Sequence, residues 1–415
     1  MKAVILAAGK GERLEPITHT RPKPFVPILG STLIERTVEE LKKFTNEIFV
    51  VINNGNEVPS TYLSFYKRLN QRYGVNFIQQ GQTYGTAAAL KSLEYLINDE
   101  FLLIYGDIYF DLNKVKDIIN VEGNAILGVE VSNPREYGVI YYDNEKDILS
   151  KIVEKPNYSE SNVINAGIYK FTPDIFTYVN KTRLSERGEY ELTDALNIMV
   201  KDIQVKVIKY TGFWKDIGRP WHVIDVNKDI LSRIKTDIRG KVDDKVKIIG
   251  DVIIEEGAEV LYGTYIEGPA YIGKNSIVGP NSYIRKNTVL VGNNRIGASV
   301  EIKESIVMEY AKIPHLSYVG DSIICEHVNL GAGTLVANLR FDEKEVRMTI
   351  KGRRESSERR KLGTIIGGYA KTGINVSILP GIKIGAYAWI YPGSVVNRDV
   401  AANEKFSSLQ ESKLS

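Results

Sequence analysis

The sequence is poor in the residues that disulfides and metal clusters require. Its 415 residues include one cysteine, Cys325, and four histidines. One cysteine excludes an intrachain disulfide and a cysteine cluster for a metal, and it favours a reducing compartment. Hydrophobic cores must therefore stabilise the chain, and its length is sufficient for two or three domains.

Long apolar runs and a strong charge imbalance are also missing. No stretch reaches the roughly 18 apolar residues of a membrane-spanning helix, and the first apolar run ends at Gly9, too early for a secretory signal. The formal net charge is +3, which gives no general case for binding nucleic acid or a membrane. We therefore expect a cytoplasmic protein without nucleic-acid or membrane partners.

The first half of the chain alternates short apolar runs with segments of helical periodicity. Strands are predicted at Ala3–Ala8, Ile48–Asn53, Val75–Gln79 and Phe101–Tyr105, with helices at Leu33–Phe44, Tyr62–Tyr73 and Thr86–Leu96. This alternation favours a parallel, doubly wound α/β sheet of Rossmann-like type. Because ligands of such sheets bind at the carboxyl ends of the strands, the turns after Ala8 and Tyr105 are candidate binding segments.

The turn at Gly9 and Gly11 suits an anion. Glycines let successive backbone N–H groups form a concave nest, Arg13 supplies a planar fork, and Lys23 adds a mobile point charge. The turn fits neither the Walker A pattern nor GxGxxG, because Leu14 stands where the third glycine would be. Taken alone, the two glycines are equally compatible with a plain tight turn.

The longer string LAAGxGxRLxPxTxxxPKP closely resembles the signature of the sugar-1-phosphate nucleotidylyltransferases. The resemblance implies that this segment wraps the triphosphate of an NTP, with Arg13 and Lys23 as catalytic residues. Later segments resemble the family's base-recognition and sugar-binding strands. The nucleotide-binding residues so implied are Leu6, Ala8, Gly9, Gly11, Gln79, Gly85 and Thr86. The sugar-phosphate-binding residues so implied are Gly138, Glu154, Lys155 and Asn165.

Asp107 follows a buried strand at a position that suits Mg²⁺, which binds one or two carboxylates together with phosphates and water. A turn or helix-capping aspartate is the structural alternative. The resemblance places Asp216 on the same metal, as in the glucose-1-phosphate thymidylyltransferase branch, whereas bacterial uridylyltransferases use an asparagine further along. In the implied reaction, the sugar phosphate attacks the α-phosphorus of the NTP and pyrophosphate leaves.

The second half of the chain has a different texture, with aliphatic residues about every six positions and glycine or asparagine at the turns between them. The first run of such residues is Ile249, Ile254, Val260, Ile266, Ile272, Val278, Ile284, Leu290 and Ile296. The pattern resumes over Gly363–Val400 and predicts a parallel β-helix of hexapeptide repeats, because single coils cannot bury their apolar face alone. Family resemblance implies that the β-helix is left-handed and forms a homotrimer.

Domain boundaries follow from these patterns. We expect a nucleotidylyltransferase domain at 1–223, a linker helix at 224–240, a β-helix domain at 241–405 and a C-terminal tail at 406–415. Leu339–Leu362 interrupts the repeat and reads as an excursion loop. Its basic cluster favours a solvated face over an anion site.

The segments His315–Asp321 and Val328–Thr334 carry chemistry. They closely resemble the acetyltransferase site of the bacterial bifunctional glucosamine-1-phosphate acetyltransferase/N-acetylglucosamine-1-phosphate uridylyltransferases, which join the same two domain types in the same order. The resemblance implies His315 as the catalytic base, which suits histidine because its ordinary pKa lies near neutrality. The substrate-binding residues so implied are Arg285, Lys303, Tyr318, Asn329, Ala332 and Asn338.

Roles follow from the same resemblance. Arg285 and Lys303 would bind the sugar phosphate, and the backbone N–H of Ala332 would stabilise the oxyanion. Ala370–Ile374 and Ala386–Ala388 match the CoA site only loosely, and His327 is expected to be structural. A lone histidine is more often structural than catalytic, so the assignment of His315 depends on the neighbouring matches.

The sequence thus predicts an archaeal-type bifunctional enzyme that uses Mg²⁺, acetyl-CoA and UTP, with dTTP as an alternative nucleotide. The acceptor is glucosamine 1-phosphate, with galactosamine 1-phosphate or glucose 1-phosphate as alternatives. A second interpretation is a single-activity glucose-1-phosphate thymidylyl- or uridylyltransferase whose β-helix only trimerises it. A third is a non-enzymatic binding protein, because eukaryotic translation-initiation exchange-factor subunits share the domain pair. The intact site residues argue against both.

Overall fold

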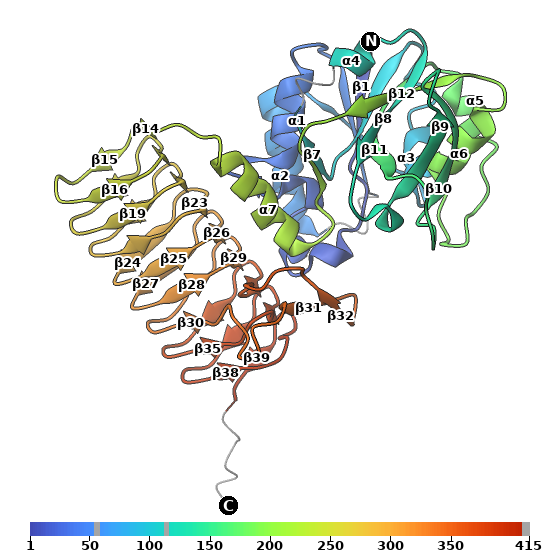
Figure 1. The fold of residues 1–415 in the computed structure, drawn as a ribbon. Helices are drawn as coiled ribbons and strands as arrows, with labels where there is room; N and C mark the ends of the chain where they lie inside the picture. The colour runs from blue at the N-terminus through green and yellow to red at the C-terminus, as the bar shows by residue number, and fades with distance from the viewer. Residues whose placement is uncertain (54–58, 112–115, 409–415) are drawn as a thin grey trace, which may run out of the picture. The chain divides into compact units, whose positions relative to one another are not determined.

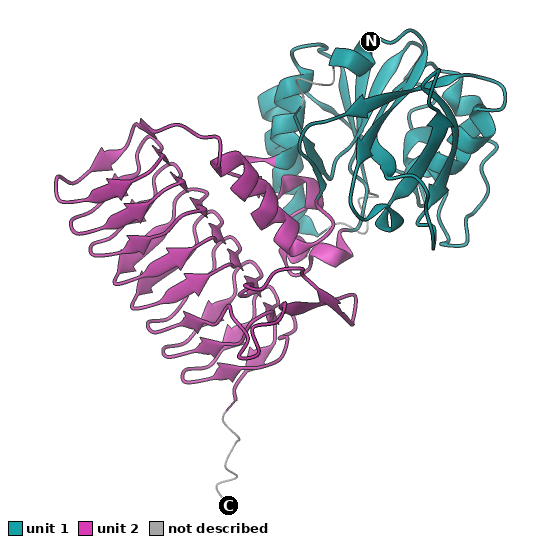
Figure 2. Cartoon of the chain, in the orientation of Figure 1, with its two compact units in different colours: residues 1–10, 33–216 teal, residues 11–32, 217–415 magenta. Residues whose placement is uncertain are grey.

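The computed structural model describes residues 1–53, 59–111 and 116–408, and the chain divides into two compact units. Unit 1 comprises Met1–Lys10 and Leu33–Asp216, and unit 2 comprises Gly11–Thr32 and Ile217–Ser415 (Figure 1, Figure 2). The segment Gly11–Thr32 therefore packs with the second half of the chain although it lies near the N-terminus. Among the described residues, no helix is long and apolar enough to cross a membrane.

Unit 1 is built on a nine-stranded sheet with the order β5-β4-β1-β6-β11-β8-β12-β10-β9. In chain order, its strands are β1 (Lys2–Leu6), β4 (Ile48–Ile52), β5 (Asn76–Gln79), β6 (Phe101–Tyr105), β8 (Asn124–Glu130), β9 (Gly138–Asp143), β10 (Ile148–Glu154), β11 (Val163–Phe171) and β12 (Val205–Tyr210). A separate two-stranded pairing joins β7 (Ile108–Phe110) to β13 (Trp214–Asp216).

The predicted parallel sheet is confirmed for only part of unit 1. Strands β5, β4, β1 and β6 are mutually parallel, as expected for buried apolar runs such as the fully buried β4. The expectation is wrong for β9, β10 and β11, which run antiparallel to sheet neighbours. Only four residues separate β9 from β10, and so short a connection can join antiparallel strands only.

Short helices flank the strands of unit 1. They are α1 (Leu33–Leu41), α2 (Ser60–Tyr73), α3 (Thr86–Lys91), α4 (Lys116–Ile119), α5 (Ile175–Val179) and α6 (Leu192–Met199). Helix α1 illustrates why they form, because Leu33, Ile34, Val38 and Leu41 recur at helical spacing and are all buried. The three helices predicted from periodicity are present, each with an end shifted by a few residues.

In unit 2 the chain winds into a coil, and each turn of the coil contributes strands to three parallel sheets in a repeating order. The first sheet contains β14 (Asp237–Ile238), β17 (Val252–Ile254), β20 (Ala270–Ile272), β23 (Thr288–Leu290), β26 (Ile306–Val307), β29 (Ile323–Ile324), β33 (Ile365–Ile366) and β36 (Lys383–Ile384). The second contains β15 (Lys241–Val242), β18 (Glu259–Val260), β21 (Ile277–Val278), β24 (Arg295–Ala298) and β27 (Lys312–His315), and continues as β34 (Lys371–Thr372), β37 (Trp389–Ile390) and β39 (Lys405–Phe406). The third contains β16 (Lys247–Ile249), β19 (Tyr265–Glu267), β22 (Tyr283–Ile284), β25 (Glu301–Lys303), β28 (Tyr318–Gly320), β30 (Leu335–Val336), β35 (Ser377–Ile378) and β38 (Val395–Val396).

In most strands an aliphatic residue points into the coil and stacks on its equivalent in the next turn. Ile266 pairs with Ile284, and Ile284 with Ile302, and all three are fully buried. The prediction that Ile249 belongs to the buried repeat is wrong, because Ile249 is 47% exposed. Its neighbour Ile248 aligns with Ile266 instead. A strand side chain one position out of register faces the opposite side of the sheet.

Three further pieces complete unit 2. The helix α7 (Pro220–Leu231) precedes the coil, and the excursion loop contains the hairpin β31 (Arg347–Ile350) and β32 (Arg353–Ser356). The segment Gly11–Thr32 contains three short 3₁₀ turns, at Glu12–Leu14, Ile17–His19 and Lys23–Phe25, and the pair β2 (Pro27–Ile28) and β3 (Ser31–Thr32). Residues 409–415 of the expected tail lie outside the described residues.

Replacing Ile284 by alanine should lower the free energy of unfolding by about 2–5 kcal/mol, because the coil interior cannot collapse onto the lost atoms. Urea denaturation measures the change. The control is Ile249→Ala, which removes the same atoms from an exposed position and should change stability by less than about 0.5 kcal/mol. Equal effects of the two substitutions would contradict the stacking of Ile284 inside the coil.

Candidate active sites

All the predicted nucleotide-binding residues except Gly11 belong to unit 1 and lie at or after the carboxyl ends of the parallel strands β1 and β5. Leu6 and Ala8 are buried at the end of β1, whereas a side chain at Gly9 would extend into open space. The backbone N–H of the next residue, Lys10, donates to the Tyr84 hydroxyl at 3.4 Å. The open position beside Gly9 therefore borders the loop that holds Gly85 and Thr86.

The Gly85 loop is shaped by close backbone approach. Gly85 has a φ of +125°, and a Cβ there would lie 2.3 Å from the carbonyl oxygen of Tyr190. The hydroxyl of Thr86 accepts the backbone N–H of Leu192 at 2.9 Å, which fixes the start of α3. The Gln80 amide donates to Thr83 O and Gly85 O, whereas the predicted base reader Gln79 is exposed at the end of β5.

Three of the predicted sugar-phosphate-binding residues, Gly138, Glu154 and Lys155, lie on or next to the antiparallel strands β9 and β10 of the same sheet. Glu154 pairs with Gly138 across β10 and β9, and a side chain at Gly138 would lie 2.9 Å from the Glu154 carboxylate. Burial raises the pKa of Glu154, which the nearby Arg187 partly offsets. The next residue, Lys155, has a φ of +43°, and its N–H donates to Tyr137 O at 3.0 Å.

Two tyrosines underlie this group of residues. Asn165 donates to the Tyr169 hydroxyl at 2.6 Å, and that hydroxyl donates to Tyr105 at 3.0 Å. Burial raises the pKa of Tyr105, and the charges of Glu154 and Asp107 raise it further. Through Tyr169, Tyr105 is thus linked to the predicted sugar-binding Asn165, and it lies two residues before the predicted metal ligand Asp107.

The pairing of β7 with β13 brings the backbone of the two predicted metal ligands to neighbouring register positions. Asp216 is the register partner of Ile108, the residue after Asp107. The Tyr137 hydroxyl donates to Asp216 at 3.1 Å. Within the described ranges no group of three His, Cys, Asp or Glu side chains could hold a metal. Two carboxylates nevertheless fit Mg²⁺, which takes its remaining ligands from phosphates and water.

Arg13, Lys23 and Gly11 belong to unit 2 by their packing. Arg13 lies in the 3₁₀ turn Glu12–Leu14, which follows Gly11 at a φ of +72°. A Cβ at Gly11 would lie 2.8 Å from Thr18 and 3.4 Å from Lys23, so only glycine permits this close turn. Lys23 begins the turn Lys23–Phe25, and both cationic side chains are half-buried.

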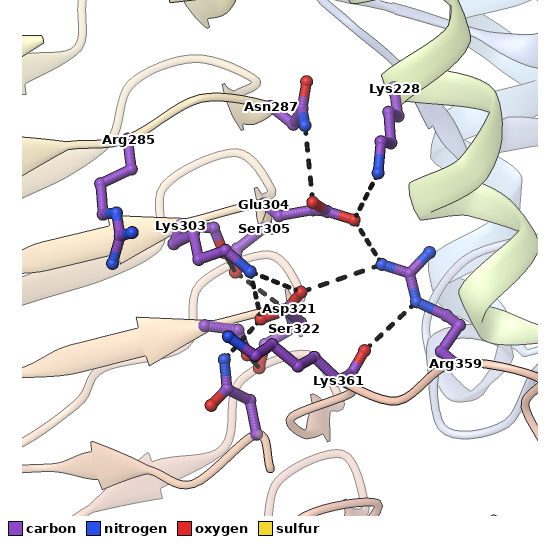
Figure 3. Close-up of polar contacts among 12 residues, drawn as sticks. Lys228, Arg285, Asn287, Lys303, Glu304, Ser305, Asp321, Ser322, Arg359 and Lys361 are labelled. Carbon is purple, nitrogen blue, oxygen red and sulfur yellow. Dashed lines mark hydrogen bonds and ion pairs between the residues drawn. The ribbon is translucent and has the colours of Figure 1, made fainter. Parts of the chain in front are cut away.

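The coil places several predicted acetyltransferase residues around one carboxylate, Asp321. The Lys303 ammonium lies 3.0 Å from both oxygens of Asp321, whose side chain is 2% exposed (Figure 3). The Asn338 amide donates to Asp321 and, at 3.1 Å, to the Tyr318 hydroxyl. Burial and then the charge of Asp321 raise the pKa of Tyr318.

The other predicted residues lie on neighbouring coils. The Arg285 guanidinium donates to Glu301 at 2.8 Å. Glu301 lies one turn of the coil before Tyr318, which is its register partner. The backbone N–H of Gly333 donates to the carbonyl of His315 at 3.4 Å, so the predicted base lies beside the residue after Ala332. Asn329 forms parallel bridges with Lys312 and Lys371 on the coils before and after it. The imidazole of His315 is exposed on the surface of the coil.

The excursion loop contributes a cation that is not solvated. Arg359 donates to Glu304 of the coil at 2.5 Å and lies 3.9 Å from Asp321 (Figure 3). It also donates to Asp225 of α7 at 2.6 Å. Burial alone would raise the pKa of Glu304, but Arg359 and Lys228 together lower it. The expected solvated face is therefore wrong for Arg359, whose side chain is 15% exposed.

Sequence reasoning missed three residues that organise these sites, namely Tyr105, Gln80 and Asp321. Tyr105 ends a predicted strand, Gln80 follows another, and Asp321 closes the segment His315–Asp321. A polar residue at the end of an apolar run, or at a coil corner, was the available signal. Each acts on its neighbours inside the fold, which spacing along the sequence does not reveal.

Comparison with known proteins matches both halves of the chain. The Nucleotidyl transferase family matches residues 2–233, and the GMPPB C-terminal domain family matches residues 266–371. The chain is 59% identical to the bifunctional sugar-1-phosphate nucleotidylyltransferase/acetyltransferase of Sulfurisphaera tokodaii, over 98% of this chain and 100% of that protein. It is 45% identical to the bifunctional protein GlmU of Methanocaldococcus jannaschii, over 97% and 96%. It is also 32% identical to a glucose-1-phosphate thymidylyltransferase of Streptomyces antibioticus, over 80% and 93%.

Replacing Asp321 by asparagine should destabilise unit 2 by about 3–5 kcal/mol, because the buried Lys303 ammonium would lose its counter-charge. Urea denaturation followed by circular dichroism measures this change. The matched control is Asp342→Asn, since Asp342 pairs with Arg340 on the exposed surface of the same unit. No measurable change is expected in the control, and an equally silent Asp321→Asn would contradict the buried ion pair.

Proposed function

The chain belongs to the bifunctional sugar-1-phosphate nucleotidylyltransferase/acetyltransferases, and we propose that it makes UDP-N-acetylglucosamine in two steps. One step acetylates glucosamine 1-phosphate with acetyl-CoA, and the other transfers a uridylyl group from UTP to the sugar 1-phosphate. The observation that carries the proposal is that one chain holds both residue sets, Arg13 and Lys23 in its signature segment and His315 in its coil.

The nucleotidyl transfer needs positioning and charge neutralisation more than acid–base chemistry. The attacking phosphate oxygen is already ionised, and it forms a bond to the α-phosphorus while the bond to pyrophosphate breaks. Arg13 and Lys23 would neutralise the leaving pyrophosphate and the α-phosphate. Gly9 and Gly11 would present backbone N–H groups to the triphosphate, with Leu6 and Ala8 beneath them.

Base and sugar would be read by the residues at the strand ends of unit 1. Gln79 and the Gly85–Thr86 turn would contact the base, and the closely packed backbone at Gly85 makes this turn rigid. Gly138, Glu154, Lys155 and Asn165 would contact the sugar phosphate. Asp107 and Asp216 would hold Mg²⁺, which supplies positive charge for the nucleotide and sugar phosphates when bound.

The acetyl transfer requires a neutral amine and a stabilised oxyanion. The amine nitrogen forms a bond to the acetyl carbon, the carbon–sulfur bond breaks, and CoA leaves as the thiol. His315 would take the proton of the amine, and the backbone N–H of Ala332 would stabilise the tetrahedral oxyanion. Arg285 and Lys303 would bind the sugar phosphate, and Tyr318 and Asn329 would bind the sugar. Asn338 would lie near the acceptor amine and the acetyl group.

The finer proposals concern assembly and substrate choice. We infer a left-handed coil that forms a homotrimer, and an enzyme active in the cytoplasm, where UTP and acetyl-CoA are made. We retain the proposed domain limits of 1–223, 224–240, 241–405 and 406–415. The thymidylyltransferase relative favours testing dTTP and glucose 1-phosphate as alternative substrates, with the coil as a scaffold in that case.

The decisive experiment incubates the purified protein with glucosamine 1-phosphate, acetyl-CoA, UTP and Mg²⁺, and identifies the products by mass. UDP-N-acetylglucosamine should form only when acetyl-CoA is present. A parallel reaction supplies N-acetylglucosamine 1-phosphate directly. If uridylylation occurs there but no acetylated product forms in the first reaction, the acetyl transfer to glucosamine 1-phosphate is refuted.

Replacing Lys23 by alanine should lower kcat for uridylyl transfer by about 100-fold, because the ammonium group that stabilises the negatively charged transition state is lost. Pyrophosphate release with N-acetylglucosamine 1-phosphate and UTP measures the rate. Acetyl transfer serves as the internal control and should be unchanged. Intact uridylyl turnover in Lys23→Ala would refute the catalytic assignment.

Replacing His315 by alanine should lower acetyl transfer by about 100-fold or more, the range of a lost general base. Thiol release from acetyl-CoA with glucosamine 1-phosphate measures the rate, and uridylyl transfer should remain at its normal level. The matched control is His327→Ala, a histidine of the same coil that stacks on Tyr310 at 4.8 Å. Loss of acetylation in both variants would argue against a specific role for His315.

A further inference from the structure

Three consecutive residues of the segment Gly11–Thr32 contact one corner of the coil, and we call His19–Arg21 the strap. The corner positions concerned are Glu309, Glu326, Gly368 and Ala386. They occupy equivalent positions on successive turns of the coil. The carbonyls of the first three accept the N–H groups of His327, Tyr369 and Tyr387 at 2.9–3.1 Å, and each donor directly follows the next corner position. The strap therefore follows the axis of the coil.

Each strap residue meets a different coil. The backbone N–H of Ala386 donates to Nδ1 of His19 at 3.3 Å. A Cβ at Gly368 would lie 2.7 Å from the Thr20 hydroxyl oxygen, so this corner leaves room for glycine only. Arg21 reaches the two glutamates that precede Gly368 along the corner.

Arg21 makes the strongest of these contacts. Its guanidinium donates to Glu309 at 2.6 Å and to Glu326 at 3.4 Å, and the residue is 1% exposed. Burial alone would lower the pKa of Arg21, but the charges of Glu309 and Glu326 raise it. A buried arginine with two carboxylate partners fixes its backbone firmly, since moving it would leave charges unpaired.

The same guanidinium also holds the turn that carries Lys23. Its second amino group donates to the carbonyl of Phe25 at 3.1 Å. The N–H of Phe25 donates in turn to Pro22 at 2.9 Å, and the N–H of Val26 donates to Lys23 at 3.3 Å. The turn Lys23–Phe25 is thus tied to the coil through one side chain two positions before Lys23.

We propose that Arg21 is a positioning residue for nucleotidyl transfer, acting through its salt bridges to Glu309 and Glu326 to fix the turn that carries Lys23. The inference rests on the proposed role of Lys23 in uridylyl transfer. It makes two glutamates of the coil necessary for the reaction of the other half of the chain. The coil then supports both activities, one directly and one through the strap.

The test compares a full-length triple variant with a full-length control variant. Arg21→Met alone leaves the buried Glu326 and the half-buried Glu309 without their counter-charge, which destabilises the coil. The triple variant Arg21→Met/Glu309→Gln/Glu326→Gln removes all three charges together and avoids that penalty. Glu259→Gln is the matched control, because it removes a carboxylate of the coil that pairs with the exposed Lys241.

The readouts are kcat and KM for uridylyl transfer, acetyl transfer, and hydrogen exchange at Phe25 and Val26. In the triple variant we expect kcat for uridylyl transfer to fall about 10-fold or more, because small misplacements of a charged group weaken catalysis strongly. Acetyl transfer should stay within about twofold of wild type, and exchange at the two amides should accelerate. Glu259→Gln should match wild type in every readout.

Two results would overturn the inference. Unchanged uridylyl kcat in the triple variant would mean that the salt bridges do not position Lys23. A parallel fall of uridylyl and acetyl transfer would mean that Arg21 only stabilises the fold. Lys23→Ala, assayed beside these variants, separates this failure from that of the premise. Full turnover there removes the role of Lys23 itself, whereas an inactive Lys23→Ala with an active triple variant refutes the strap alone.

Discussion

The parallel pairing of strands between successive turns of the coil is the constraint on which unit 2 depends. It aligns residues of equivalent coils, so that Ile266, Ile284 and Ile302 stack inside while Glu309 and Glu326 stack at a corner. The excursion loop does not disturb this register, because the N–H of Gly363 returns to the carbonyl of Asp321 at 2.9 Å. Every site on the coil is thus held by the same backbone ladder, and a site can combine residues that lie far apart along the chain.

Buried carboxylates with more than one partner are the second organising feature. Asp321 joins Lys303 and Asn338, and Glu304 joins Arg359 and Lys228. Because Arg359 and Lys228 lower the pKa of Glu304, its contribution to stability is present above the ordinary glutamate pKa and is lost as the pH falls through the lowered value. Networks of this kind tie the excursion loop and α7 to the coil beside the predicted acetyltransferase residues (Figure 3).

Unit 1 positions its residues through irregularity in a sheet. The pairing of β11 with β8 shifts register between Asn165 and Tyr169, and such shifts re-aim side chains near functional sites. Asn165 can therefore bond to the hydroxyl of Tyr169, although the two residues belong to one strand. The hydroxyls of Tyr169 and Tyr105 then extend this hydrogen bond across two strands, from Asn165 on β11 to the end of β6.

The sequence alone determined the features that depend on local patterns and on a long signature. Apolar runs and helical spacing located the strands and helices of the first half, and the six-residue period located the coil. The parallel direction of every strand did not follow, because short connections reverse β9 and β10. Only the tertiary structure showed Arg359 as a partner of the buried Glu304, Asp321 as a common acceptor, and Arg21 bound to the coil. Charge along a sequence indicates solvent exposure on average, whereas burial and pairing depend on which distant segments the coil brings together.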